Sequence, residues 1–563
     1  MQKSVRIGCH SAFWGDSVEA ARQLVEHGGH LDYLVSDYLA EITMCILARS
    51  KKKARGGAGD GGFVQEFVDY VWRPLMKPLL DRNIKVITNA GGMNPKALKE
   101  AIEKATADAG LPVPKIAAVV ERLADLRGEN ALKTFQVGGE EEKLWDESKL
   151  VMSANAYIGA FPIAQALEDG AQVVVTGRCV DSAIVLGPLI HEYGWKEEQY
   201  DLLSSGSLAG HIIECGCQAT GGNFTDWRES LKGGWDNVGF PIVECAADGS
   251  FIVTKPEKTG GIVTVATVCE QLLYEIGDPA AYILPDVTCD WSNVIVEQQV
   301  PSSGGAGRVS VRGAKGRSPT DTYKVSITSV DGFRMNATLM IGGESAAEKA
   351  EAVGRAILNR ASNILKRRKM PPFTHTSVEA LGSEHTYGPH SAARQSREVS
   401  CRWYKSRDHC SASPVILFSS CLVPREKVEI TIYNGDSKRN FEEKKRQQTS
   451  GCNCCGPQCT CQACKNKKLP SPTYVTLKGD QMVQVPLLRL CYARSGDKGD
   501  LCNVGVIARS PNIYPFLLSF LTQERVTSHF QHLVQGKITR YPLPGISALN
   551  FVMTRALGGD DRT

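Results

Sequence analysis

Short apolar runs alternate with amphipathic segments along the N-terminal part of the chain. The runs that we interpret as strands are Val5–Cys9, Leu31–Val35, Ile84–Thr88, Lys115–Val120 and Val173–Thr176. Segments with the length and periodicity of helices separate them, and parallel strands need crossover connections of this kind. The run of valines in the fifth strand shows no alternation, which is typical of a strand covered on both faces. The pattern therefore predicts an α/β domain with a mostly parallel sheet.

Local signals mark where several helices begin. Asp16 followed by Glu19 fits a capping box for the first helix. Asn94 is placed to cap another helix, with Pro95 at its first position. The apolar segment Ser182–His191 follows the fifth strand and is also predicted to be a helix.

The composition changes twice farther along the chain. Between residues 206 and 343, short β-rich runs such as Ile262–Val265 and Tyr323–Thr328 predominate. Residues 436–468 are charged and rich in cysteine, and the strand-like run Pro544–Met553 lies near the end of the chain. We therefore expect an α/β domain with a β-rich continuation over residues 1–435, a linker or insertion rich in Lys and Cys over 436–472, and a small α+β domain over 473–563.

Charged side chains directly follow the predicted strands. Arg178 and Asp181 lie in the turn after the fifth strand, and ligands of open α/β sheets bind outside the carboxyl ends of the strands. Asp37 follows the second strand in the same way, and the polar run Glu214–Asp226 opens with a further carboxylate. These residues are candidates for acid–base catalysis. A structural ion pair between Arg178 and Asp181 that caps the next helix is the alternative.

The C-terminal segment carries a second concentration of functional side chains. We predict that Ala493–Gly505 is a polar loop between the strands Val483–Tyr492 and Val504–Ala508. A glycine-rich hairpin with solvated charges is the alternative. Because the charges of this segment need partners, we expect Lys498 to contribute to the same pocket as Arg178.

Asparagines and glycines in these stretches can supply hydrogen bonds to a ligand. Glycine lets the backbone approach a ligand closely, and a helix start after Asn94 offers free N–H groups to an anion. A tight turn with a good cap explains the stretch Asn89–Pro95 equally well. The predicted substrate-binding residues are Asn89, Gly91, Gly92, Asn94, Asn155, Gly221, Gly222, Asn223, Arg494, Ser495 and Asn503.

The composition narrows the range of partners. The chain has 563 residues with 65 Lys and Arg against 61 Asp and Glu, a net charge of +4, so no global field favours nucleic acid. The N-terminus lacks the apolar core of a signal peptide, and no apolar run reaches the roughly 20 residues of a membrane span. We therefore expect a cytoplasmic protein without nucleic-acid or membrane partners.

Two groups of residues could bind metal. Six of the 19 cysteines are clustered, and clustered thiolates bind zinc, although the flanking lysines are also typical of an inserted linker. A zinc ion there would be structural. A weaker hypothesis is a metal enzyme that uses His10, Asp286 and Asp290, but turns explain the two aspartates equally well. The clustered cysteines are Cys452, Cys454, Cys455, Cys459, Cys461 and Cys464.

Several of these stretches together resemble the acyclic terpene utilisation (AtuA) family. They are Asp32–Glu41, Asn89–Pro95, Asn155–Ala160 with Thr176–Asp181, Gln218–Asn223 and Arg494–Asp500. The resemblance implies a large N-terminal domain and a small C-terminal domain of ferredoxin-like character. It also implies a role in the catabolism of terpenoids like citronellol and geraniol, on a route that uses CoA thioesters. The cysteine-rich insert departs from the family pattern.

With this resemblance, the polar residues at the strand ends suggest an enzyme of hydratase or lyase type. Its substrate would be a terpenoid or branched acyl compound, as an acyl-CoA, and no cofactor would be required. Such chemistry needs an acid–base carboxylate and donors to an enolate-like oxygen. The alternative is a non-catalytic subunit or scaffold of an acyl-CoA pathway complex, and we expect a homo-oligomer. The predicted catalytic residues are Asp181, Glu214, Arg178, Asp37, Lys498 and Asp497.

Overall fold

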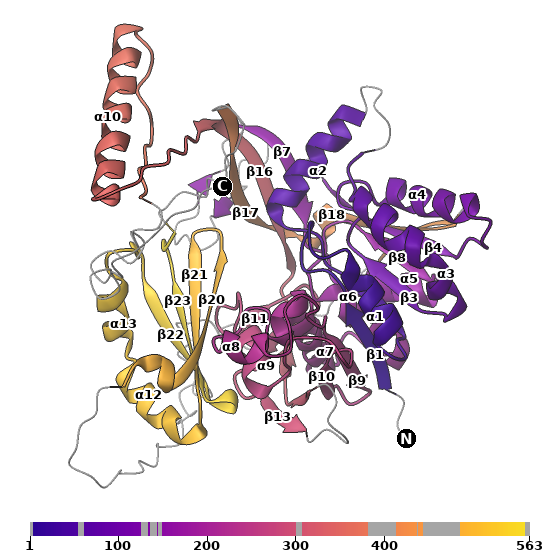
Figure 1. Ribbon diagram of the computed structural model, residues 1–563. Coiled ribbons are helices and arrows are strands. Elements are labelled where there is room, and N and C mark those ends of the chain that lie inside the picture. Colours follow the sequence, from indigo (N-terminus) through magenta and orange to yellow (C-terminus); the bar gives the residue numbers. More distant parts are fainter. Residues whose placement is uncertain are drawn as a thin grey trace.

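The centre of the protein is a large mixed sheet (Figure 1). The computed structural model describes residues 4–54, 61–124, 133–135, 143–144, 149–299, 307–380, 412–435, 437–442 and 485–557. Within these ranges the sheet has 11 strands. In order across the sheet they are β13 (Ile295–Gln299), β14 (Arg308–Arg312), β10 (Phe251–Thr254), β9 (Ile242–Ala246), β1 (Ser4–Cys9), β2 (Tyr33–Ser36), β3 (Lys85–Thr88), β8 (Val173–Thr176), β4 (Ile116–Leu123), β18 (Val428–Asn434) and β19 (Ser437–Asn440).

The middle of this sheet is parallel. Strands β1, β2, β3, β8 and β4 run in one direction, and the strands on either side of them pair antiparallel. The predicted α/β class is confirmed. The helices of this part are α1 (Glu19–His27), α2 (Glu41–Lys53), α3 (Arg73–Asp81), α4 (Pro95–Asp108), α5 (Phe161–Glu168), α6 (Ala183–Tyr193), α7 (Tyr200–Ile213), α8 (Trp227–Leu231) and α9 (Val265–Leu272).

Both faces of the parallel strands are covered by helices. Val173 and Val175 pack into the hydrophobic core that α1, α3 and α4 complete, whereas Val174 packs into the core formed with α5, α6 and α7. Successive side chains of a strand point to opposite faces, so a continuous valine run suits a strand buried on both sides. The interpretation of β8 from its sequence is therefore confirmed.

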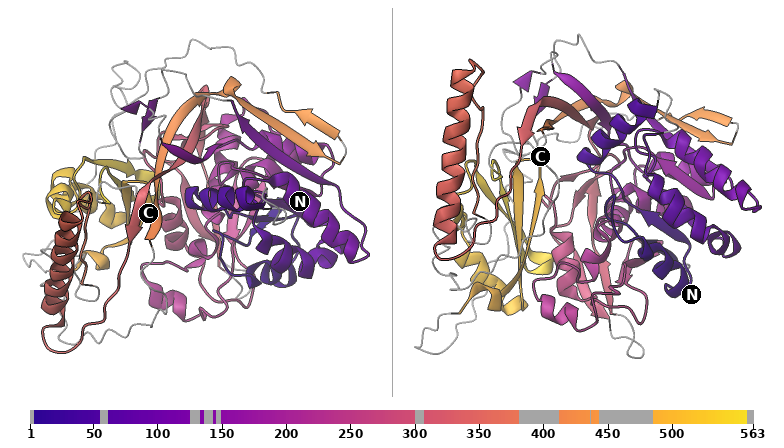
Figure 2. Two further views of the ribbon diagram at one scale, coloured as in Figure 1. Left: turned by 90° about the horizontal axis from the view of Figure 1, so that it is seen from above. Right: turned by 45° about the horizontal axis from the view of Figure 1, so that its top comes forward.

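A second sheet, with five strands in the described ranges, packs beside the first. Its strands, in order, are β6 (Lys143–Leu144), β5 (Lys133–Phe135), β17 (Ala412–Pro424), β16 (Thr322–Met335) and β7 (Leu150–Ala156). The chain continues from β16 to α10 (Ala346–Arg367), which stands at the edge of the molecule on the side of the C-terminal domain (Figures 1 and 2). A small sheet of β11 (Tyr282–Ile283), β12 (Thr288–Asp290) and β15 (Lys315–Arg317) lies next to α7.

The C-terminal domain is a four-stranded antiparallel sheet with two helices, which confirms the predicted α+β class. The strands, in order, are β20 (Cys491–Lys498), β21 (Leu501–Ala508), β23 (Ala548–Met553) and β22 (Ile538–Leu543), and the helices are α12 (Tyr514–Phe520) and α13 (Gln523–Phe530). The interpretation of Ala493–Gly505 as a polar loop is wrong, because most of it forms the β20–β21 hairpin. The alternative, a glycine-rich hairpin with solvated charges, is right about the hairpin but wrong about the charges, because Arg494 and Asp500 are buried.

Two further local predictions are corrected. Ile262–Val265 is not a strand but leads into α9, where Thr264 forms a capping box with Thr267. The predicted capping box of Asp16 and Glu19 does not form, because α1 begins later. The Asp16 carboxylate instead closes the preceding turn by accepting hydrogen bonds from backbone N–H groups.

The C-terminal domain docks on the segment that follows α9. Asn503 Nδ2 donates to Leu273 O at 2.8 Å, and Asn550 Nδ2 donates to Ile276 O at 2.9 Å and Gly277 O at 2.8 Å. Both asparagines are fully buried. The β20–β21 hairpin is thereby fixed against the large domain.

A second contact lies near α8. Arg509 donates two hydrogen bonds of 2.6 Å to the carboxylate of Asp226, and Phe224 stacks on Tyr492 with ring centroids 5.5 Å apart. In the ranges that the structure describes, no helix is both long and apolar enough to cross a membrane.

Candidate functional site

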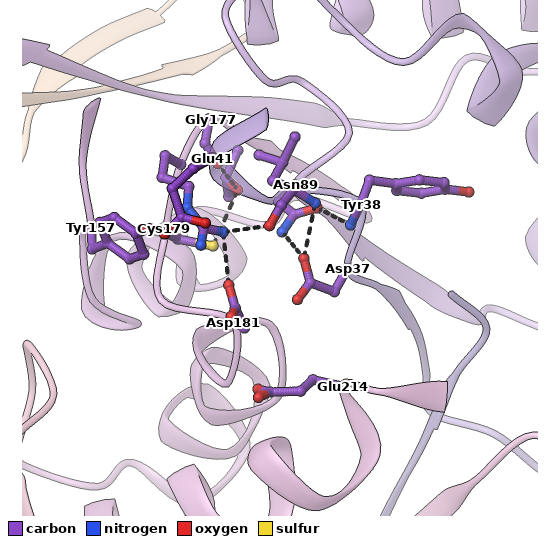
Figure 3. A network of polar contacts seen from close by, with 12 residues as sticks. Asp37, Tyr38, Glu41, Asn89, Tyr157, Gly177, Cys179, Asp181 and Glu214 are labelled. Carbon is purple, nitrogen blue, oxygen red and sulfur yellow. Dashed lines mark hydrogen bonds and ion pairs between the residues drawn. The ribbon is translucent and has the colours of Figure 1, made fainter. Parts of the chain in front are cut away.

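Polar side chains meet where the parallel strands end. Strand β2 is followed by Asp37, β3 by Asn89 and β8 by Gly177 and Arg178. These strands are parallel neighbours, so their carboxyl ends lie at the same edge of the sheet. Figure 3 shows the side chains gathered there.

Asp37 is buried and held by its neighbours. Its Oδ1 accepts hydrogen bonds from Asn89 Nδ2 at 2.6 Å and from Leu39 N at 3.2 Å. The amide oxygen of Asn89 accepts from Tyr38 N at 2.8 Å, which fixes the orientation of the amide (Figure 3). Burial raises the pKa of Asp37 well above its usual value, and Asp181 raises it further. The surroundings of Asp37 therefore favour the protonated form of its carboxyl group.

Arg178 lies beside Asp37 and is 2% exposed. Its Nη1 donates to Asp181 Oδ1 at 2.7 Å and to Leu39 O at 2.9 Å, and its guanidinium lies 4.2 Å from the ring centre of Tyr157. Burial alone would lower the pKa of Arg178, but Asp181 and other neighbours raise it well above its usual value, so the side chain stays charged. The ion pair between Arg178 and Asp181 is therefore present.

A third carboxylate approaches Asp37 and Asp181 from the end of α7. Glu214 Oε1 lies 3.3 Å from His211 Nδ1, and His211 Nε2 lies 3.2 Å from Leu272 O. Burial raises the pKa of Glu214. Its Oε2 is buried and has no hydrogen-bond partner among the described residues. An unpaired buried oxygen of this kind can accept a proton or a hydrogen bond from a ligand.

His211 is the partner of Glu214 in this cluster. Burial alone would lower the pKa of His211, but the hydrogen bond and charge of Glu214 raise it above its usual value. The imidazole packs against Trp291 and Tyr282, with ring centroids 5.2 and 5.9 Å away. It is therefore held in place on both its polar atoms and its ring faces.

The C-terminal domain brings Lys498 to the same cluster. Lys498 Nζ lies 3.1 Å from Glu275 Oε2. Burial alone would raise the pKa of Glu41, but Lys498, Arg178 and Lys324 hold it well below its usual value. The charge of Lys498 therefore acts on a carboxylate of α2, although the two residues belong to different domains.

Tyr157 connects these groups to a small pocket. Its hydroxyl donates to the Glu41 carboxylate. The pocket is a cavity of about 10 Å³, which is room for about one water molecule. The lining residues are Glu41, Met44, Asn155, Tyr157, Arg178 and Ser326.

Some predicted binding residues lie at this cluster and others have local roles. Asn89 orients Asp37, and Asn155 lines the pocket and donates to Glu121 Oε1 at 3.1 Å. Burial raises the pKa of Glu121 to about 7. Asn94 precedes α4 but does not cap it with its side chain, which donates to a backbone carbonyl instead. Gly91 and Gly92 form the tight turn of the alternative interpretation; Gly92 has a φ of 49°.

The remaining predicted residues do not reach the cluster. Gly222 and Asn223 are exposed, and Gly221 packs against Ser230 of α8. On β20, Ser495 and Asp497 are exposed.

Two predicted residues of the C-terminal domain serve its docking. Arg494 donates to Gln218 and lies 4.1 Å from the ring centre of Tyr274, and Asn503 bonds Leu273 O. Both contacts join the domains. The polar atoms of Arg494 and Asn503 are thus hydrogen-bonded to other residues of the protein.

The predicted metal ligands are not brought together in the described part of the chain. Asp290 Oδ1 accepts from Ser292 N at 3.0 Å and closes a turn, whereas Asp286 Oδ2 accepts from Ala160 N at 2.8 Å, the residue before α5. His10 is buried, and burial lowers its pKa to about 3. Among the described residues no group of three His, Cys, Asp or Glu side chains is arranged around a metal position. The clustered cysteines lie outside these residues.

The structure adds residues that the sequence did not single out. Glu41, Tyr157, His211, Lys324 and Glu275 all belong to the cluster. Glu41 and Tyr157 fall in stretches that resemble the AtuA family, so the resemblance could have identified them. The spacing of three residues between His211 and Glu214 on a helix was a second available signal.

Comparison with known proteins identifies the family. Residues 5–431 match the model of the acyclic terpene utilisation family protein AtuA, and residues 485–561 match the AtuA ferredoxin-like domain. No curated protein and no solved structure matches the chain. The first match covers most of the chain, and it includes the strand ends that carry Asp37, Asn89 and Arg178. The chain belongs to the acyclic terpene utilisation family AtuA.

Proposed function

We propose that this chain is an enzyme of acyclic terpenoid or branched-chain acyl metabolism that performs acid–base chemistry of the hydratase or lyase type. The supporting observation is the cluster of Asp37, Asp181 and Glu214, three carboxylates from separate elements, beside the buried Arg178. Burying charges without pairing is costly, and a non-catalytic scaffold has no need to gather them. Family membership supports the terpenoid pathway.

In such a reaction one carboxyl group donates a proton and another accepts one. The raised pKa of Asp37, caused first by burial, favours its protonated form, and Asp37 is therefore the proposed proton donor. Glu214, with an unpartnered oxygen and the support of His211, is placed to accept a proton. Carboxyl groups with different surroundings divide acid and base roles in this way.

Arg178 and Lys498 would hold the oxygen on which negative charge develops. Arg178 is buried and Lys498 is partly buried, each lies beside carboxylates, and both keep their charge. For Lys498, burial alone would lower the pKa, but Glu275 and Glu41 raise it well above its usual value. Fixed cations in a site shielded from water stabilise an enolate-like oxygen strongly. The proposed substrate is an acyl-CoA whose reacting end would lie against these strand-end side chains.

The proposed reaction needs no cofactor, because hydration and dehydration move only a proton and a water molecule. Zinc at the clustered cysteines, a homo-oligomeric state and a cytoplasmic location stay predictions. None of them is needed for the chemistry proposed at the strand ends.

The test is turnover by the full chain. Purified protein is incubated with geranyl-CoA and with 3-methylglutaconyl-CoA, and products are identified by mass: gain or loss of water, or cleavage. Asp37→Asn, Asp181→Asn and Glu214→Gln should each reduce turnover by roughly 100-fold or more.

A matched control separates catalysis from general damage. Asp248→Asn changes a carboxylate in a surface turn, where Asp248 accepts hydrogen bonds from Ser250, and should retain full turnover. Equal turnover by the three site variants and the wild type would remove these carboxylates from the mechanism. Absence of turnover together with capture of a pathway enzyme would favour the non-catalytic subunit.

A further inference from the structure

The cavity of about 10 Å³ beside Tyr157 is lined by residues from the second sheet, from α2 and from the turn after β8. Asn155 of β7 and Ser326 of β16 are directly paired in the second sheet, so their side chains face the same side. Arg178 comes from the turn after β8. The lining residues are buried except for Glu41, which is partly buried. The cavity therefore lies inside the protein, where the second sheet meets the strand ends.

Two of the lining side chains have a buried polar atom without a hydrogen-bond partner among the described residues. Arg178 Nη1 donates to Asp181 Oδ1 and to Leu39 O, which leaves Arg178 Nε as a donor. Asn155 Nδ2 donates to Glu121 Oε1, which leaves Asn155 Oδ1 as an acceptor. The two side chains are 2% and 7% exposed, and polar atoms buried to this extent normally have a partner in protein or ordered water.

The walls of the cavity suit a small neutral molecule that both donates and accepts hydrogen bonds. Arg178 offers a donor and Asn155 an acceptor. One wall residue is a cation, Arg178, and one is an anion, Glu41, so the walls favour neither an anion nor a cation. A cavity of about 10–15 Å³ or more with two or more polar partners is suited to a water molecule, whereas purely apolar cavities stay dry. The size and the walls both meet this condition for water.

We propose that this cavity is a binding site for one water molecule, which accepts a hydrogen bond from Arg178 Nε and donates one to Asn155 Oδ1. The second O–H of the water is available to the carboxylate of Glu41, which is the charged acceptor in the walls. Three hydrogen bonds are typical of a buried water. The proposal concerns the binding of water and goes beyond the proposed reaction.

The water completes a continuous chain of polar contacts between two carboxylates. On one side of it, Asn155 donates to Glu121 at the end of β4. On the other side, Arg178 donates to Asp181 after β8. A water-mediated hydrogen bond is nearly as favourable as a direct one. The water thus links Asn155, a residue of the second sheet, to the central sheet at the strand ends.

A crystal structure of the full chain, at a resolution that shows ordered waters, tests the site directly. The expected result is a density peak about 2.7–3.2 Å from both Arg178 Nε and Asn155 Oδ1. Density without a peak in the cavity, or with a peak that reaches only one of these two atoms, would overturn the proposal. No substrate is used, so this result is independent of the proposed hydratase or lyase reaction, which turnover tests.

Radiolytic labelling tests the same site in solution. X-ray pulses generate hydroxyl radicals from bound water as well as from bulk water, and these radicals oxidise the side chains next to it. Met44 lines the cavity and is 3% exposed, whereas Met553 lies in the core of the C-terminal domain and is 2% exposed. In the wild type, Met44 should therefore be oxidised severalfold faster than Met553. Equal rates for the two methionines would contradict a bound water.

Two substitutions of Ser326 separate the effect of the water from that of the serine hydroxyl. Ser326→Val places methyl groups in the cavity and suits a strand, whereas Ser326→Ala removes the hydroxyl and leaves the space open. Ser326→Val should lose the excess oxidation of Met44, and Ser326→Ala should keep it. Equal oxidation of Met44 in the two folded variants would overturn the proposal. The comparison of Met44 with Met553 in the wild type needs no variant that has to fold.

Discussion

The variant Asn550→Leu should weaken the docking of the C-terminal domain by about 3–6 kcal/mol. Asn550 is fully buried, its Nδ2 bonds Ile276 O and Gly277 O, and its Oδ1 accepts from Asn503 Nδ2 at 2.9 Å. Leucine has a similar shape but leaves the carbonyl oxygens of Ile276 and Gly277 without this donor and one N–H of Asn503 without an acceptor, while the other N–H keeps Leu273 O. Each of these three unpaired donors or acceptors costs about 1–3 kcal/mol. We favour the lower half of the range because the contact with Gly277 is only partly buried. Even about 3 kcal/mol shifts the docking equilibrium more than 100-fold.

Hydrogen exchange provides the assay. Two amides of the C-terminal domain bond the large domain directly: Ala493 N to Thr225 Oγ1 at 3.0 Å and Gly545 N to Ser292 O at 3.2 Å. Loss of docking should increase exchange in peptides that contain these amides, while the core of the four-stranded sheet stays protected. Mass spectrometry after brief labelling resolves the two regions.

The same substitution at an exposed position is the control. Asn363 lies on the exposed side of α10 and makes no side-chain hydrogen bond within the described ranges. Asn363→Leu should change stability by less than about 0.5 kcal/mol. If Asn550→Leu exchanges like Asn363→Leu at both interdomain amides, the reasoning from unpaired buried groups fails.

Two further predictions concern the strand ends. The raised pKa of Asp37, caused first by burial, means that the folded protein keeps a proton that the unfolded chain releases near pH 4. The contribution of Asp37 to the free energy of unfolding is therefore fully present below pH 4 and is lost as the pH rises toward the raised pKa. Asp37→Asn should consequently show a smaller fall in melting temperature between pH 5 and pH 8 than the wild type. An equal fall in the two proteins would contradict this prediction. Gly177→Ala places a Cβ 2.3 Å from Glu121 Oε2 and should cost about 1–3 kcal/mol in chemical denaturation, whereas Gly277→Ala, which meets nothing within 4 Å, should be nearly neutral.

The strands and the strand-end residues could be predicted because their signals are local. The valine run of β8 alone indicates a strand that is covered on both faces. The rule that ligands bind at the carboxyl ends of parallel strands points to Asp37 and Arg178. Helix capping was less predictable, because the Asp16 carboxylate can accept hydrogen bonds from the backbone of a turn as well as from the first turn of a helix. Local preference therefore gave the element order but not each boundary.

The roles of the C-terminal residues could not be predicted in the same way. When Ala493–Gly505 is interpreted as a loop, all of its polar side chains seem equivalent. As a strand with period two, β20 points Arg494 and Lys498 toward the large domain and leaves Ser495 and Asp497 exposed. Asn503 bonds a carbonyl 230 positions earlier in the chain. Only the tertiary fold determines such a partner.

The charges of the cluster couple the fold to the chemistry. Arg178 comes from the central sheet, Tyr157 and Lys324 from the second sheet, and Lys498 from the C-terminal domain. Each buried ion is tolerated because ions from the other elements lie close to it, so removing one element leaves charges of the others unpaired. Undocking of the C-terminal domain would withdraw Lys498 from Glu275 and from the surroundings of Glu41. It would thereby raise the pKa of both Glu41 and Lys324, because Lys498 lowers both. Domain docking and the protonation of Glu41 and Lys324 are consequently linked equilibria.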